Sequence, residues 1–427
     1  MSIVKSSEYM YMKKEFILRI KLNKGTYVGV AFFVTTIGNS SFLTKKGLDE
    51  IVTYLGISLL LFGIIISRFK NRHTNKQIHR ISFRLFLIVE FFFSIGILMQ
   101  NIDIILKIKL LLTMFFVAAF ALLADDFVDS LEKVRQAAYG VLYGTLITTG
   151  LAIIGRESLT SIAVEGVMSS GFNGGLQHKN YFACAMLAVF SAFYLYDKYG
   201  KKRKTNKRIM VISLALLIFS NSRGALIMTF VFVVASHYDA LLKIKARHRG
   251  LFVFTICGIA VIGASLIYSF VISDSASYMI RMKGLMTYTD LYKNDSFHMW
   301  YGNAEMAWKN GNYVNNVRAV IGWDGTVELS FLSILVKNGI WGYFGYVIIF
   351  LFYIKKGLSI DNWKIKSMIL SLSLSLLSSA LVENYITNTH VIYGIFNYCI
   401  ISGLIGQSGA KKTYNTKNKD NKNVRIA

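Results

Sequence analysis

Long apolar runs, separated by polar segments, follow one another along almost the whole chain. A membrane-spanning helix needs about 20 predominantly apolar residues, with some tolerance, and about twelve runs come near that length. The pattern therefore predicts an all-α, polytopic membrane protein with about twelve transmembrane helices. We expect these helices near 26–43, 48–67, 81–100, 108–124, 134–155, 180–197, 209–221, 224–240, 250–272, 339–354, 367–385 and 390–406.

The polar segments between the runs differ greatly in length. Most are under about 15 residues, but the segment 273–338 is far longer and contains aromatic, charged and glycine residues. Long connections in compact proteins are usually functional. We therefore expect a short N-terminal segment, a first membrane region, one large extracytoplasmic loop, a second membrane region and a disordered tail. Their ranges are 1–25, 26–272, 273–338, 339–406 and 407–427.

Lys and Arg gather on alternate polar segments. With the N-terminus in the cytoplasm, the inner segments carry 35 of these residues and the outer segments carry 11, and 198–208 alone has seven. Cytoplasmic loops of membrane proteins are enriched in Lys and Arg, so both termini are expected inside. A net charge of +25 would point to nucleic acid in a soluble protein, but here it follows from membrane topology.

Composition excludes several classes of function. The chain has no proline, so breaks in its helices must come from Gly, Ser or Asn. Its cysteines lie inside apolar runs and form neither a disulfide framework nor a metal-binding spacing. The first 25 residues show no cleavable signal peptide, and no nucleotide-binding glycine motif or zinc spacing occurs. We expect neither a cofactor nor a metal.

The segment GGLQHKNYFA, residues 174–183, lies on the expected outer face directly before an apolar run. His178, Lys179 and Asn180 are expected to cap a helix that starts near Tyr181, with Asn180 as the N-cap. A helix N-terminus beside cationic side chains can bind an anion. The alternative is an ordinary polar cap at the membrane interface.

Arg223 lies in FSNSRGALI, between two apolar runs and on the expected outer face. Its guanidinium is a planar fork of donors that matches phosphate oxygens, and the neighbouring Ser222 and Gly224 would allow close approach of backbone. The alternative is an arginine that only extends from a helix hairpin to the membrane surface.

The large loop adds further candidates. Glu328 follows the turn GWDG and opens an apolar helix, where a partly desolvated carboxylate could act as a general base. The alternative is that each loop side chain is simply solvated. The charged or titratable candidates are Arg281, Lys283, His298, Glu305, Arg318, Asp324 and Glu328.

Three of these segments, in this order and topology, resemble the O-antigen ligase/polymerase superfamily, which includes Wzy-type polysaccharide repeat-unit polymerases. The resemblance covers roughly residues 130–355. GGLQHKNYFA is similar to the family's Gly-x-x-x-His-Pro-Asn segment, SNSRGAL to its Ser-Arg-Gly segment, and the loop end GWDGTVELSFLSILVKNGIWG to the end of its large extracytoplasmic loop.

The resemblance implies a metal-independent membrane glycosyltransferase at the outer face of the plasma membrane. Its substrates would be undecaprenyl-diphosphate-linked oligosaccharide units, joined into capsular, O-antigen or exopolysaccharide chains without a nucleotide sugar. The expected partners are the glycan donor and acceptor, the bilayer and a chain-length co-polymerase, with no nucleic acid. By this resemblance, Arg223 and Arg281 would bind the diphosphate, supported by His178, Lys179 and Asn180. Glu328, or alternatively His298, would be the catalytic base.

The chain departs from the family pattern at three places. Lys179 stands where the family has proline, Val327-Glu328 where ligases carry His-Asn, and Phe297-His298 where a second loop arginine often lies. The missing His-Asn favours a polymerase over a ligase that transfers finished glycan to another acceptor. A flippase is less favoured, because few charges other than Glu90 fall within the apolar runs.

Overall fold

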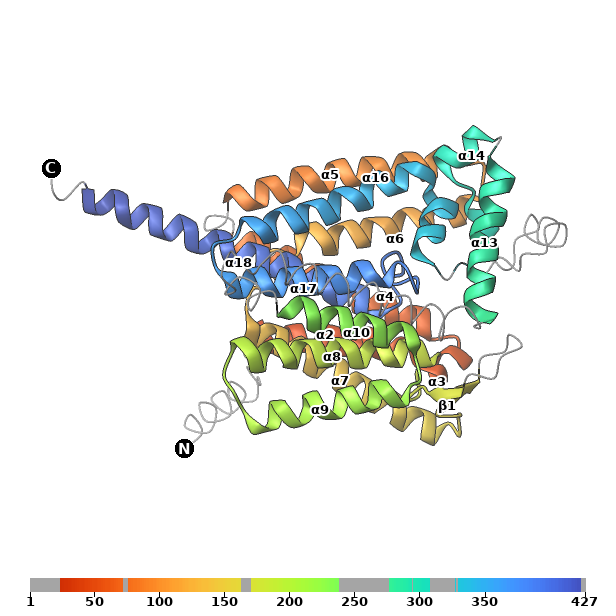
Figure 1. Ribbon diagram of the computed structural model, residues 1–427, viewed down its shortest axis with the longest axis horizontal. Coiled ribbons are helices and arrows are strands. Elements are labelled where there is room, and N and C mark those ends of the chain that lie inside the picture. The colour runs from red at the N-terminus through yellow and green to blue at the C-terminus, as the bar shows by residue number, and fades with distance from the viewer. Residues whose placement is uncertain are drawn as a thin grey trace, which may run out of the picture.

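The structure is a computed structural model that describes residues 24–71, 76–162, 170–237, 276–293, 295–307, 327 and 329–423. Its helices form a bundle whose long axis lies horizontally in Figure 1. One end of the bundle carries α3, α13 and α14, and α18 extends from the other end. We call these the cap end and the tail end.

The first half of the bundle contains α2 to α10 and one short β-hairpin, in which β1 and β2 are antiparallel. Thr160 pairs with Phe172 in this hairpin, which lies at the cap end (Figure 1). The elements are α2 (Lys24–Ile37), α3 (Ser41–Lys45), α4 (Asp49–Lys70), α5 (Lys76–Leu98), α6 (Ile104–Leu123), α7 (Leu131–Ile154), β1 (Thr160–Ile162), β2 (Ser170–Phe172), α8 (Lys179–Tyr199), α9 (Lys204–Phe219) and α10 (Arg223–Ser236).

The second half contains α13 (Ala276–Tyr292), α14 (Ser296–Tyr301), the 3-10 helix η2 (Ala304–Ala307), α16 (Ser330–Ser359), α17 (Trp363–Ser379) and α18 (Ile392–Asn423). The expected helix at 250–272 lies outside the described residues. Two expected helices end early: the run 26–43 is divided into α2 and α3, and the run 367–385 stops being helical at Ser379. Beyond 406, α18 continues as helix to Asn423.

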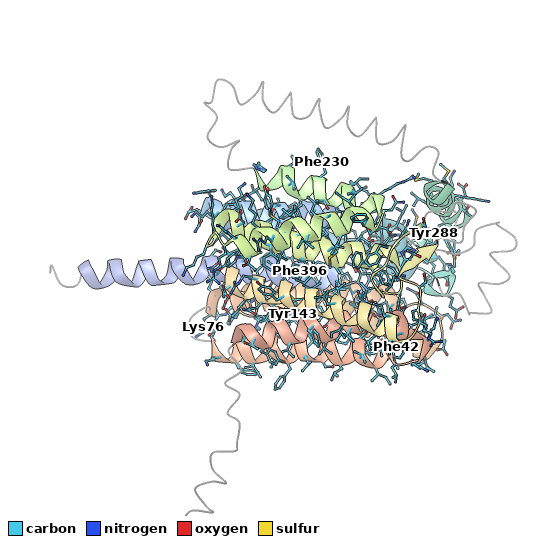
Figure 2. The ribbon with its side chains drawn as sticks, turned by 90° about the horizontal axis from the view of Figure 1, so that it is seen from below. Phe42, Lys76, Tyr143, Phe230, Tyr288 and Phe396 are labelled. Carbon is cyan, nitrogen blue, oxygen red and sulfur yellow. The ribbon has the colours of Figure 1, made fainter. Side chains whose placement is uncertain are left out.

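The outside of the bundle is apolar. Within the described residues, α4, α5, α6, α7 and α16 are long and apolar enough to cross a membrane. Large apolar side chains on the bundle surface are exposed, among them Phe62, Phe91 and Phe230. Figure 2 shows Phe230 at the edge of the bundle and Phe396, which is fully buried, in its middle. Exposed apolar area on this scale needs a lipid environment, which confirms an all-α membrane protein.

One helix is broken by glycine, as the absence of proline requires. Gly339 interrupts α16 with φ 62° and ψ −159°, a conformation that L-residues rarely adopt. A Cβ at this position would lie 2.3 Å from the carbonyl oxygen of Trp300. The break divides α16 into a first part at the cap end and a longer second part that packs along α5.

The first part of α16 packs against α13 and η2 at the cap end of the bundle. Tyr288 of α13, Met306 of η2 and Leu332 and Val336 of α16 belong to a small apolar cluster separate from the main core. Gln100, after α5, fixes this layer to the bundle: its amide nitrogen donates to the carbonyl oxygens of Tyr301 (2.6 Å) and Lys337 (2.8 Å). Most described residues of the expected large loop are therefore helical, in α13, α14, η2 and the first part of α16.

Helices α2 and α7 pack closely through two Gly-x-x-x-Gly patterns. Gly25 and Gly29 lie on α2, and Gly140 and Gly144 lie on α7. A Cβ on Gly140 would lie 2.1 Å from the carbonyl oxygen of Gly29. Small residues at this spacing let membrane helices approach until their backbones touch, and here they bring α2 and α7 together.

We expect Gly140→Ala to lower stability by about 1–3 kcal/mol, as overpacking of a tight contact typically does. Gly150→Ala is the matched control, because it lies on the same helix and a Cβ there meets nothing within 4 Å. Alanine is the better helix former, so the control variant should be neutral or slightly more stable. Thermal unfolding in detergent measures both variants, and equal midpoints would contradict the close packing of α2 on α7.

Candidate functional site

The segment that precedes α8 is held in place by two glycines with positive φ. Gly174 has φ 54° and Gly175 has φ 76°. A Cβ on Gly175 would lie 2.3 Å from the carbonyl oxygen of Thr148 on α7, so the chain passes close against that helix. Thr149 donates to the carbonyl oxygen of Gly174 at 2.7 Å, and the backbone nitrogen of Ser41 donates to that of Gly175 at 2.9 Å. The position of the following residues is therefore fixed by α7 and α3.

The N-cap of α8 is His178, and the expectation that Asn180 is the cap was wrong. Nδ1 of His178 accepts a hydrogen bond from the backbone nitrogen of Asn180 at 3.1 Å. The helix thus begins two residues earlier than expected, at Lys179. Because Nδ1 is the acceptor, a neutral His178 ring carries its proton on Nε2. The side chain of Asn180, relieved of the capping role, points into the site described below.

Lys179 is a buried cation at the start of α8. The residue is only 6% exposed, and its Nζ donates a hydrogen bond to the carbonyl oxygen of Asn221 at 3.4 Å. Asn221 belongs to the turn between α9 and α10, has φ 53° and donates to Ser170 of β2. Lys179 therefore joins the start of α8 to the turn from which α10 begins.

Arg223 is the first residue of α10 and is exposed. Ser222, its N-cap, makes no capping hydrogen bond, and its buried hydroxyl has no hydrogen-bond partner within the described structure. A Cβ on Gly224 would lie 3.1 Å from Cγ of Glu383. Ser222 and Gly224 were expected to allow close approach of backbone, but the group that lies close to Gly224 is the side chain of Glu383.

Glu383 is the site residue that the sequence analysis missed. It follows α17 in a non-helical segment, 380–391, and is only 9% exposed. Its Oε1 accepts a hydrogen bond from Nδ2 of Asn180 at 2.8 Å. Its carbonyl oxygen accepts from both the backbone nitrogen (3.3 Å) and the hydroxyl (2.8 Å) of Ser330 at the start of α16. Glu383 is therefore held by groups from α8 and α16.

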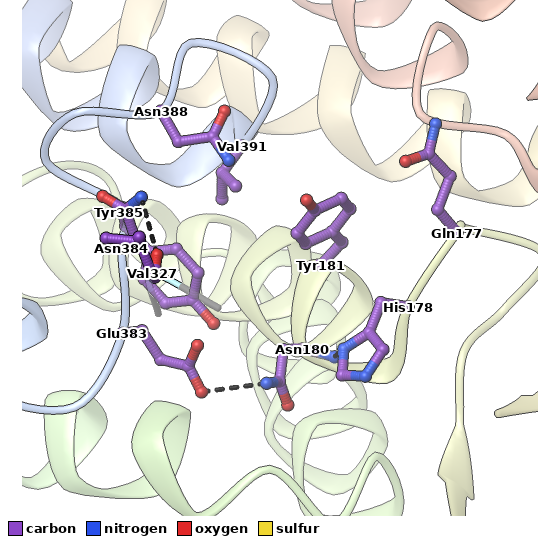
Figure 3. Close-up of a pocket in the computed structure, with 10 residues that line it drawn as sticks. All are labelled: Gln177, His178, Asn180, Tyr181, Val327, Glu383, Asn384, Tyr385, Asn388 and Val391. Atoms are coloured by element: carbon purple, nitrogen blue, oxygen red, sulfur yellow. Dashed lines mark hydrogen bonds between the residues drawn. The ribbon is translucent and has the colours of Figure 1, made fainter. Parts of the chain in front are cut away.

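A pocket opens beside Glu383 and Asn180 at the cap end. Its volume is about 370 Å³. Figure 3 shows side-chain amides, tyrosines and a histidine around it, with the hydrogen bond between Asn180 and Glu383 on one side. The hydroxyl of Tyr385 is buried and makes no hydrogen bond within the described structure. The lining residues are Gln177, His178, Asn180, Tyr181, Val327, Glu383, Asn384, Tyr385, Asn388 and Val391.

The electrostatics at this place favour an anion. Lys179 lies within electrostatic reach of both Arg223 and Glu383, so two cations accompany one carboxylate. The N-termini of α8 and α10 also converge here, and each adds roughly half a positive charge. Two cations and two helix N-termini against one carboxylate leave an excess of positive charge here, and no side chain caps the start of α10.

The structure does not place every expected residue at this pocket. His178 and Asn180 line it, and Lys179 lies within electrostatic reach of both Glu383 and Arg223. Lys283 on α13 and Glu305 on η2 do not line it. Arg281 is part of α13, but its side chain is outside the described structure, as are Arg318, Asp324 and Glu328 as whole residues.

His298 lies on α14 and does not line the pocket. Its Nδ1 is 2.5 Å from Oδ2 of Asp295, the N-cap of that helix. Asp295 also accepts from the backbone nitrogen of His298, and these hydrogen bonds hold the pKa of Asp295 below its usual value of 3.8. In this structure, His298 helps to hold the start of α14, a short helix at the cap end of the bundle.

The lowered pKa of Asp295 makes the attachment of α14 sensitive to acid. A carboxylate with a depressed pKa contributes stability above its unfolded pKa, and that stability is lost as pH falls through the folded pKa. We therefore expect α14 to loosen as the pH falls below about 4. Fluorescence of Trp300, on α14, should report the change. Asp295→Ala, which cannot accept the capping hydrogen bond, should show the shifted signal already at pH 7 and no transition in acid. An unchanged acid transition would contradict the role of Asp295 as the N-cap of α14.

Comparison with known proteins adds no family assignment. No protein-family model matches the chain, and no curated protein matches it.

Proposed function

We propose that the protein is a membrane glycosyltransferase that polymerises undecaprenyl-diphosphate-linked oligosaccharide units into a surface polysaccharide. The observation that carries this proposal is the convergence at Glu383. There, the start of α8 through Asn180 and the start of α10 through Gly224 meet one buried carboxylate at the edge of a polar pocket. The cations Lys179 and Arg223 lie at these helix starts. Such a site combines an anion-binding surface with a potential base, which are the two functions that the transfer requires.

The cationic side of the site would hold the donor diphosphate. Arg223 offers a planar fork that can bind two phosphate oxygens, and Lys179 offers a compact charge beside it. The hydroxyl of Ser222, buried at the N-terminus of α10, can add a further hydrogen bond to an oxygen. In the transition state the diphosphate gains negative charge as it leaves, and groups fixed around it stabilise that charge.

The pocket side would hold the acceptor sugar. Its amides and tyrosines are the kind of neutral donors and acceptors that match sugar hydroxyls. Glu383 would take the proton from the attacking acceptor hydroxyl. The acceptor oxygen then bonds to the anomeric carbon, the bond from that carbon to the phosphate oxygen breaks, and undecaprenyl diphosphate leaves as an anion. One displacement of this kind inverts the anomeric configuration.

The distribution of basic residues supports an outward-facing pocket in the plasma membrane. The basic segment 198–208 spans the end of α8 and the start of α9, at the end of the bundle opposite to the pocket. Since Lys and Arg favour the cytoplasmic side, the tail end would be inside and the cap end outside. The donor and acceptor would then reach the site from the outer leaflet, as the lipid-linked units of this reaction class do.

The proposal is tested with purified protein in lipid vesicles and a lipid-linked repeat unit as the only sugar substrate. A ladder of lengthened, lipid-linked products is the expected result. One transfer to an added, unrelated acceptor without a ladder would indicate a ligase. Movement of the unit across the bilayer without a new glycosidic bond would indicate a flippase and contradict the enzyme proposal.

A further inference from the structure

A second cluster of chemically active side chains lies at the tail end, away from the pocket. His79 is in the first turn of α5, and Asp125 and Asp126 lie in the connection between α6 and α7. Oδ2 of Asp126 is 2.6 Å from Nε2 of His79, and Oδ1 of Asp125 is 3.9 Å from the same nitrogen. One ligand atom from each of the three residues lies within 4.8 Å of the other two.

The carboxylate of Asp125 is poorly satisfied for a buried charge. The residue is 1% exposed, yet neither carboxylate oxygen has a hydrogen-bond partner of good geometry among the described residues, although the hydroxyl of Ser82 lies nearby. Arg68 is the nearest described cation, with its guanidinium 3.7 Å from Oδ1. That guanidinium instead donates to the backbone carbonyl oxygens of His79 (2.8 Å) and Leu123 (3.5 Å). Burial of a carboxylate without good hydrogen bonds has a high free-energy cost. We therefore expect Asp125 to bind a further ligand.

We propose that His79, Asp125 and Asp126 form a binding site for a divalent first-row transition cation such as Mn²⁺ or Zn²⁺. One imidazole with two carboxylates suits these ions better than Ca²⁺ or Mg²⁺, which favour oxygen ligands alone. Donor atoms that bind one such ion at about 2.1 Å lie roughly 3–4 Å apart. To reach this spacing, the distances between the ligand atoms of His79, Asp125 and Asp126 would have to change only by a few tenths of an ångström to a little under one ångström.

The competing occupant of this cluster is a proton. A protonated His79 would neutralise Asp126 across the 2.6 Å contact, and Arg68 would partly balance Asp125. A cation must displace that proton, because imidazole binds a metal only when neutral. The proposed ion would bridge the start of α5 and the α6–α7 connection, which lies against α18 at Gly406. It would therefore stabilise the tail end without contact with the pocket.

The test uses the full chain in detergent after treatment with a chelator, and then Mn²⁺ or Zn²⁺ alone. We expect one ion per chain, a higher midpoint of thermal unfolding, and at least tenfold weaker binding in His79→Gln, Asp125→Asn and Asp126→Asn. His237→Gln and Asp129→Asn are matched controls, since both residues lie near the same end but outside the cluster. Equal binding by wild type and the three variants, or no binding of either metal, would overturn the proposal.

A measurement on the wild-type chain covers the case in which the variants fail to fold. Diethylpyrocarbonate modifies neutral imidazoles, and mass spectrometry locates the modified residue. We expect added metal to protect His79 and leave the modification of His237 unchanged. Equal modification of His79 with and without metal would show that the cluster is only a network of protein charges, and the proposal would fall.

Discussion

Glu383→Gln should lower the rate of glycan polymerisation by roughly 10²–10⁴-fold while the binding of the lipid-linked donor changes little. This range is typical for loss of a general base. Glutamine has nearly the shape of glutamate, and its carbonyl oxygen can still accept the hydrogen bond from Asn180. The hydrogen bonds from Ser330 go to the backbone of residue 383 and are unaffected. The variant therefore removes the basic group and its negative charge, and it leaves these hydrogen bonds in place.

The control for this variant is Glu157→Gln. Glu157 is also at the cap end, where it pairs with Lys45, and it does not line the pocket. We expect nearly normal product ladders from it. Glu328→Gln and His298→Gln should be measured in the same series, because the sequence alone favours those residues as bases. The geometry favours Glu383, so its variant should show the largest loss of turnover.

Two outcomes would contradict the role of Glu383. If Glu383→Gln raises KM for the donor and leaves kcat unchanged, Glu383 serves only as the counter-charge of Lys179 and Arg223. If turnover remains normal, the base lies elsewhere. A pH–rate profile separates these cases further, because loss of the base should remove the acid limb of the wild-type curve.

Arg223→Ala should lower product formation by roughly 10²–10³-fold, the usual cost of removing one group that stabilises charge in the transition state. Arg223 is exposed at the first turn of α10, so its truncation should leave the fold intact. Arg223→Lys should recover only part of the rate, because an ammonium cannot reproduce the two-point contact of a guanidinium. The resemblance to the polymerase family predicts a similar loss for Arg281→Ala.

Lys283→Ala is the matched control for the arginine variants. Lys283 is an exposed cation on α13 at the cap end and is not part of the pocket lining. This variant tests whether the loss of any positive charge at the cap end lowers product formation. Wild-type product lengths from Arg223→Ala, or an equal loss from Lys283→Ala, would contradict a specific diphosphate site at the start of α10.

The hydrophobic pattern was sufficient to predict most helices, because each apolar run must satisfy its own backbone hydrogen bonds in a bilayer. It failed where an apolar run contains a helix end. The run 367–385 reads as one helix, but α17 ends at Ser379, and Glu383 lies in the segment that follows. Without proline, no residue type marks that end clearly. The available signal was an acidic residue inside an apolar run, which is expensive unless it has a function or a partner.

Only part of the candidate site could be predicted from the sequence, and the reason is related. His178, Lys179 and Arg223 are recognisable because they stand at the starts of apolar runs. Periodicity says nothing about which helix starts meet, and the contact from Asn180 to Glu383 joins residues 203 positions apart. The role of His178 as N-cap was also hidden, because histidine is a less common cap than asparagine.

Because Asn180 and Glu383 are far apart in the sequence, the two halves of the site are synthesised at different times. Translation at roughly 5–20 residues per second would place about 10–40 s between the emergence of Asn180 and that of Glu383, 203 residues later. Until then, the starts of α8 and α10 face lipid headgroups and water with their cations but without the carboxylate. The nascent chain can therefore insert most of its helices before the proposed site is complete, and a product truncated before residue 383 would carry the cationic half of that site alone.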